Sequence, residues 1–216
     1  MSRTQRLIVV LVLNLGLVAG LVVVGVTAHS IAVLAEGGDY LLDAVGVAVA
    51  LLAIWLAARP ATRTRPGGYP NATSVAALIN AGWLLMLELI VAGASLDRLA
   101  TRTPEVHGLP VLVASGIAAV VMTAGALVLR GDDEGDEPDL SVAAVLLDTV
   151  ADAATAACVA VVGAIILATD GWYWLDPAVA LIIAIVVAYH ALALIRKVLI
   201  RLRPRVDGAS SRSCRG

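Results

Sequence analysis

The sequence predicts an all-α integral membrane protein, built as a bundle of six membrane-spanning helices. Of its 216 residues, 60% are apolar and only 15% are charged, whereas soluble domains average about 45–50% and about 25%. The mean hydropathy of +0.94 agrees with this reading. A chain of this length could not bury such an apolar excess inside one water-soluble core. The composition therefore excludes a soluble enzyme, a disordered chain and a nucleic-acid-binding protein.

Six apolar stretches are long enough to cross a membrane, because about 20 helical residues cover about 30 Å of hydrocarbon. These spans are expected at residues 7–28, 31–58, 72–96, 109–129, 140–168 and 177–200. Proline and glycine mark the connections, as in Pro66-Gly67-Gly68. Residues 1–203 are therefore predicted to form one transmembrane domain, and residues 204–216 a short, disordered cytoplasmic tail.

The basic residues predict the orientation of the spans. With the N-terminus in the cytoplasm, 13 of the 15 Lys and Arg residues fall on the cytoplasmic side, and only Arg98 and Arg102 fall opposite. Cytoplasmic loops carry such an excess of basic residues. We therefore expect a multi-pass protein of the cytoplasmic (inner) membrane with both termini in the cytoplasm.

Two pairs of aspartates lie inside predicted spans. Asp39 and Asp43 belong to the second span, and Asp148 and Asp152 to the fifth. Each pair has i, i+4 spacing, which stacks two carboxylates about 5–6 Å apart on one helix face. Charged side chains are costly in hydrocarbon, and neither span contains a basic residue to offset them. Four carboxylates in this arrangement would hold protons or a divalent cation bound through oxygen.

The two pairs occupy matching positions in two halves of the chain. Spans one to three and spans four to six each carry a pair in the middle span, and these two spans run in opposite directions. The halves thus have inverted topology, a recurrent plan of secondary transporters that place their site between the repeats. The predicted fold is therefore two inverted three-helix halves.

Several segments now point to a known family. His29-Ser-Ile-Ala-Val-Leu-Ala-Glu36-Gly-Gly-Asp39-Tyr-Leu-Leu-Asp43 is similar to the second helix of cation diffusion facilitators. Trp172-Tyr-Trp-Leu-Asp176-Pro177-Ala-Val-Ala-Leu181 resembles the start of their sixth helix. Asn14 in the first span and Ala76-Ala-Leu-Ile-Asn80 in the third are similar as well. The resemblance covers roughly residues 7–200, and the paired Asp motifs are its most specific part.

The resemblance implies a proton-coupled exporter of divalent transition metals that forms a homodimer in the lipid bilayer. Its transport site falls on Asp39, Asp43, Asp148 and Asp152. The metal is cargo, and no resident cofactor is expected. This sequence departs from the family in three ways: both pairs begin with Asp where His is common, only about sixteen residues follow the last span, and an acidic run at 132–139 replaces a His-rich loop. That run is either a solvated loop or a collector of cations.

Four other polar residues are candidate accessory groups. Asn14 either adds an oxygen to the site or bonds a neighbouring helix. Glu36 and Asp176 lie near the outer face, where each is either a helix cap or part of a release path. Glu88 in the third span is either a proton relay or a dimer contact. The residues alone do not choose between these alternatives.

The donor set favours one metal over others. Carboxylates suit Mg²⁺, Ca²⁺ and Mn²⁺, whereas imidazole suits Zn²⁺, so an all-Asp site favours Mn²⁺, with Zn²⁺, Co²⁺ and Fe²⁺ as alternatives. A non-transporting membrane subunit that senses metal is a second reading. An intramembrane aspartyl protease is a remote third, since that chemistry needs one carboxylate from each of two facing helices.

Overall fold

The computed structural model describes residues 3–57, 72–130 and 140–202, and within these ranges every regular element is an α-helix. Six helices follow one another along the chain: α1 (Arg3–Thr27), α2 (Ile31–Ala57), α3 (Ala72–Ala100), α4 (Gly108–Arg130), α5 (Leu140–Thr169) and α6 (Leu175–Leu202). The predicted six-helix bundle is confirmed. The acidic run at 132–139 and the tail at 204–216 lie outside the described residues.

The helices extend slightly beyond several of the predicted spans. α1 begins at Arg3, four residues before the predicted start, and α3 continues to Ala100, four residues past the predicted end. Hydropathy marks only the stretch that lipid favours, whereas backbone hydrogen bonds continue into polar residues. The amide of Thr101, for example, still donates to the carbonyl of Asp97 at 2.9 Å. The helical ends therefore extend past the apolar segments.

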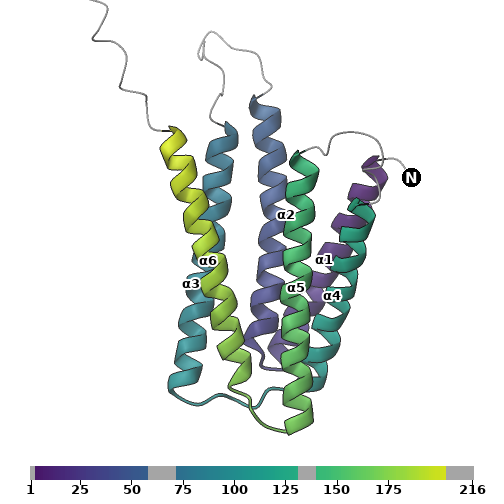
Figure 1. Cartoon of the computed structure of the whole chain (residues 1–216), viewed down its shortest axis with the longest axis vertical. Coiled ribbons are helices and arrows are strands. Elements are labelled where there is room, and N and C mark those ends of the chain that lie inside the picture. The colour runs from purple at the N-terminus through teal and green to yellow at the C-terminus, as the bar shows by residue number, and fades with distance from the viewer. Residues whose placement is uncertain (1–2, 58–71, 131–139, 203–216) are drawn as a thin grey trace, which may run out of the picture.

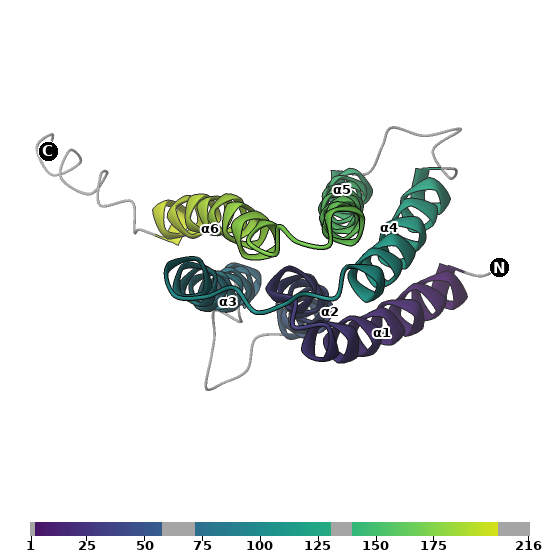
Figure 2. The same ribbon diagram turned by 90° about the horizontal axis from the view of Figure 1, so that it is seen from below.

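Two groups of helices make up the bundle. Helices α3 and α6 lie together on one side, and α1, α2, α4 and α5 form the other group (Figure 2). Contacts are most extensive between α4 and α5 and between α3 and α6, and α2 packs against both α1 and α3. Each helix of the first half also contacts its counterpart in the second: α1 with α4, α2 with α5, and α3 with α6. This pairing agrees with the predicted inverted halves.

One end of the bundle holds three described connections (Figure 1). The links from α1 to α2, α3 to α4 and α5 to α6 lie there, and we call this end the turn end. Helices α1 and α6 begin and finish, respectively, at the opposite end (Figure 1). The two outermost described residues of the chain therefore lie on the same side of the bundle, as the predicted orientation requires.

The surface of the bundle is suited to lipid. Four helical stretches in the described residues are long and apolar enough to cross a membrane: Ser74–Ala100, Gly108–Leu127, Thr149–Thr169 and Leu175–Ile200. α1 contributes a shorter apolar stretch, Leu15–Thr27, and α2, with 27 residues, is about 40 Å long. Large apolar side chains such as Leu89 and Ile182 point outwards. The chain is a multi-pass membrane protein.

Glycine allows α4 and α5 to cross closely near the turn end. A Cβ placed on Gly108 would lie 2.6 Å from the backbone nitrogen of Leu167, and one on Gly163 would lie 2.6 Å from that of Leu112. Neither neighbour is a flexible side-chain tip, so both positions need glycine. Small residues at helix crossings are a common basis of association in membranes. This contact holds α4 against α5, the helix that carries the second Asp pair.

Candidate functional site

Helix α2 carries the first Asp pair in the half of its length nearest the turn end. Asp39 and Asp43 are half-buried, and Asp39 lies in electrostatic range of Asp43, of Asp152 on α5 and of Glu88 on α3. Three helices thus bring acidic side chains to one region of the bundle. Asp39 of the second predicted span and Asp152 of the fifth interact electrostatically.

The Asp39 and Glu88 carboxyl groups are incompletely satisfied. Glu88 is only 1% exposed, and neither of its carboxylate oxygens has a hydrogen-bond partner among the described residues. The same holds for Oδ1 of Asp39. Buried polar atoms are nearly always paired, because an unpaired one loses its hydration without compensation. Unpaired carboxylate oxygens inside a membrane bundle are therefore typical of a site that holds a cation or protons.

A hydrogen-bond network lies beside this region. Ser115 of α4 donates to Oε2 of Glu36 at 2.7 Å, and the Tyr40 hydroxyl donates to Oε1 of Glu36 at 3.4 Å. The Tyr40 hydroxyl also lies 3.5 Å from the backbone oxygen of Asp152. The network joins α2, α4 and α5 around the site. Sequence reasoning did not single out Tyr40 or Ser115, although a buried tyrosine one residue after Asp39 was a usable signal.

Asp176 serves as a helix cap. Its carboxylate accepts hydrogen bonds from the Ser30 hydroxyl at 2.5 Å and from the Ile31 amide at 2.8 Å, and Ser30 Oγ accepts one from the Val33 amide at 3.1 Å. These amides form the first turn of α2, whose N-H groups have no partners within the helix. Of the two alternatives for Asp176, the structure supports the cap. The contact also joins the first residues of α6 to those of α2.

Glu88 does not face the outside of the bundle. Because its side chain is 1% exposed within a single chain, it is not available to touch a second copy. This burial disfavours the dimer-contact alternative for Glu88, since α3 turns this residue towards α2 rather than towards lipid. The other alternative, a proton relay, stays a prediction.

The four-aspartate centre stays a prediction. The side chains of Asn14 and Asp148 lie outside those that the structure describes, although both residues belong to described helices. Among the side chains that are described, no group of three or more His, Cys, Asp or Glu residues is close enough to hold a metal ion. Asp39, Asp43 and Asp152 interact electrostatically without yet forming a closed coordination shell.

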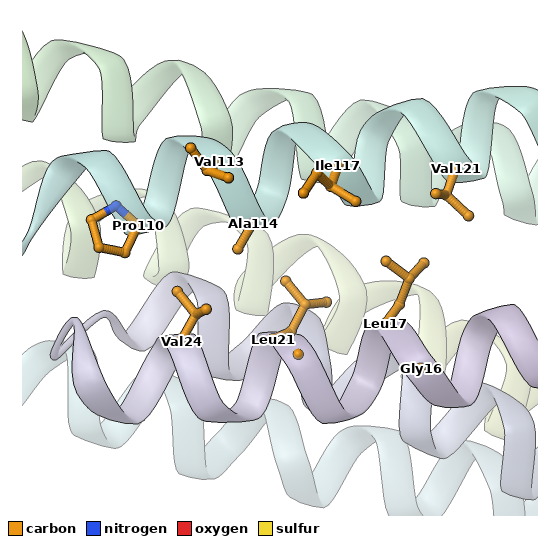
Figure 3. A pocket seen from close by; sticks show the side chains of 10 residues that line it. Gly16, Leu17, Leu21, Val24, Pro110, Val113, Ala114, Ile117 and Val121 are labelled. Atoms are coloured by element: carbon orange, nitrogen blue, oxygen red, sulfur yellow. The ribbon is translucent and has the colours of Figure 1, made fainter.

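An apolar cavity lies apart from this site. It has a volume of about 500 Å³ and lies between α1 and α4 (Figure 3). Leu17, Leu21 and Val24 line one wall, and Val113 and Ile117 line the other. Because its lining has no charged side chain, this cavity offers nothing to bind an ion.

The sequence profile of the cation efflux transmembrane domain matches residues 7–202. The chain belongs to the cation efflux, or cation diffusion facilitator, family. This confirms the resemblance drawn from the paired Asp motifs. It also makes the protease reading wrong, because the relatives of this chain are named as transporters and antiporters rather than enzymes.

Three relatives illustrate the similarity. A cadmium, cobalt and zinc/H(+)-K(+) antiporter of Bacillus velezensis is 30% identical over 171 residues, which cover 77% of this chain and 53% of that protein. The human proton-coupled zinc antiporter SLC30A2 is 26% identical, covering 85% and 51% of the two chains. The zinc transporter ZitB of Escherichia coli is 26% identical, covering 90% and 61%. The chain thus spans about half to three-fifths of the length of these relatives.

Proposed function

We propose that this protein exports divalent transition-metal cations from the cytoplasm in exchange for protons. Asp39, Asp43, Asp148 and Asp152 are the proposed ligands of the cation. The observation that carries the proposal is the meeting of Asp39 with Asp43, Asp152 and Glu88 in the apolar bundle, where buried carboxylate oxygens lack partners among the described residues. Membership in the cation efflux family supports it further.

Exchange follows from competition for the same oxygens. A divalent cation binds ionised carboxylates, so its binding displaces protons, and renewed protonation releases the cation. Because no His, Lys or Arg occurs in α2 or α5, the exchanged protons must reside on the carboxylates. The proposed direction is outward across the cytoplasmic membrane, with both termini inside. We also propose that the transporter is a homodimer.

Two observations favour different metals as cargo. An all-oxygen donor set favours Mn²⁺, whereas the names of the relatives mention zinc, cadmium and cobalt. Zn²⁺ is therefore the second candidate, since carboxylate oxygens also form tetrahedral zinc shells. We take Mn²⁺ as the proposed cargo, because the donor set belongs to this chain itself.

Flux through reconstituted vesicles tests the function. Purified protein is placed in liposomes that contain a metal-sensitive dye, a pH gradient is applied, and Mn²⁺ or Zn²⁺ is added outside. We expect dye quenching that requires the pH gradient and is competed by the second metal. Metal binding without flux would overturn export and favour the metal-sensing reading instead.

A further inference from the structure

Glu88 lies close enough to Asp39 for their carboxyl groups to interact, as Asp43 and Asp152 also do. It comes from α3, a helix that carries neither Asp pair. Its side chain is fully enclosed, and both of its oxygens lack hydrogen-bond partners among the described residues. A carboxyl group in such a place holds either a proton or a cation, and α3 contains only one basic residue, Arg98 in its last turn.

Arg98 is engaged elsewhere. Its guanidinium donates to the backbone carbonyl of His29 in the link from α1 to α2. Glu88 lies ten residues earlier in α3, about 15 Å along the helix axis. The Glu88 carboxyl group is therefore paired with the Asp39 carboxyl group rather than with a basic residue of α3. Two adjacent carboxyl groups in an apolar place hold either a proton or a cation between them.

The packing of α2 on α3 places Glu88 at the level of Asp39. A Cβ on Gly38 would lie 3.0 Å from Cδ2 of Leu87, and a Cβ on Gly46 would lie 2.4 Å from Oδ1 of Asn80. These two contacts define an antiparallel register between the helices. Asp39 and Glu88 are the immediate neighbours of the Gly38–Leu87 contact, so the register agrees with their electrostatic pairing.

We propose that Glu88 is a further ligand of the transported cation, reaching it from α3 beside Asp39, and that it shifts the site's preference towards Mn²⁺. This inference rests on the proposed function. Zinc in proteins usually takes four ligands, whereas manganese takes six, mostly oxygens. An added carboxylate beyond the four aspartates contributes to a six-coordinate shell and contributes little to a tetrahedral one.

The test compares two buried, unpartnered positions of the same helix. Glu88→Gln removes the charge at nearly constant shape. Ser95→Ala is the matched control, because Ser95 is fully buried in α3 and its Oγ has no partner among the described residues, yet it carries no charge. Full-length wild type and both variants are purified in detergent. Mn²⁺ affinity is measured from the spectroscopic signal of free Mn²⁺, and Zn²⁺ affinity by competition.

We expect Glu88→Gln to weaken Mn²⁺ binding by about tenfold or more and Zn²⁺ binding by less than about threefold. Ser95→Ala should leave both affinities within about twofold of wild type. An unchanged Mn²⁺ affinity in Glu88→Gln would overturn the proposal, and so would an equal loss for both metals. A wild type that binds neither metal would instead overturn the proposed function.

A conservative variant keeps the test decisive if Glu88→Gln does not fold. Glu88→Asp retains the charge on a side chain one methylene shorter. Its Mn²⁺ affinity should fall between those of wild type and Glu88→Gln, with Zn²⁺ affinity close to wild type. Wild-type affinity for Mn²⁺ in Glu88→Asp, in a protein where Glu88→Gln cannot be measured, counts against the proposal.

Discussion

The bundle holds two kinds of buried carboxylate, and they differ in how they are satisfied. Towards the turn end, Asp176 accepts from a hydroxyl and a backbone amide, and Glu36 accepts from two hydroxyls. Further along α2 and α3, oxygens of Asp39 and Glu88 have no such partners among the described residues. The four residues carry the same functional group, so side-chain chemistry alone does not separate them. Their surroundings separate carboxyl groups that stabilise the fold from the two that we propose to bind a cation.

The largest effect is expected at Asp39, one of the two carboxyl groups whose oxygens lack hydrogen-bond partners among the described residues. Asp39→Asn should reduce metal flux in vesicles by at least about 100-fold, since a ligand at the centre of the carboxylate group is lost. The variant should insert and unfold like the wild type or resist heat slightly better, because a buried charge without a full set of partners is removed. Wild-type flux from Asp39→Asn would contradict the assigned site.

The next largest effect is expected at Asp176, a carboxylate that accepts hydrogen bonds from its neighbours. Asp176→Leu leaves the Ser30 hydroxyl and the Ile31 amide without their acceptor, and we expect it to destabilise the protein by about 3 kcal/mol. Thermal unfolding in detergent measures this loss. The vesicles should still show metal-dependent flux at a temperature where the variant is folded. A loss of flux without a loss of stability would place Asp176 in the transport path instead.

A smaller effect is expected at the hydroxyl on α4. Ser115→Ala removes the 2.7 Å hydrogen bond to Glu36 and leaves the longer one from Tyr40. The expected cost is about 1–2 kcal/mol, because the bond is made to a carboxylate in a buried place. The measurement is again thermal unfolding, with Thr123→Ala as the control, since that exposed hydroxyl of α4 only bonds its own helix.

The smallest effect is expected at Tyr40, and it shows how much each of the two hydroxyls that donate to Glu36 contributes. Tyr40→Phe removes a hydroxyl whose two contacts are long, 3.4 Å to Glu36 and 3.5 Å to the Asp152 carbonyl. Contacts at these lengths contribute less than well-formed hydrogen bonds, so stability should fall by about 0.5 kcal/mol or less. A drop as large as that of Ser115→Ala would mean that Tyr40 holds Glu36 in place as strongly as Ser115 does.

Much of this fold was predictable from local patterns. Apolar length gave the six helices, and the i, i+4 spacing placed Asp39 and Asp43 on one face of α2. That Asp176 caps α2 rather than its own helix was not predictable, because Asp176 and Ile31 are 145 residues apart. Glu88 could be placed in α3 but not turned towards α2, since that depends on how Gly38 and Gly46 let the two helices approach. The pairing of α3 with α6 likewise depends on packing that no local pattern records.

The contact of Asp176 with the start of α2 constrains how the bundle can rearrange. Separating α6 from α2 at the turn end would remove the hydrogen bonds between the Asp176 carboxylate and the first turn of α2, at a cost of several kcal/mol. Close backbone crossing at Gly108 and Gly163 resists separation of α4 from α5 near the same end. Helix tilting that keeps these two contacts closed would therefore produce its widest displacements at the opposite end, where α1 begins and α6 finishes.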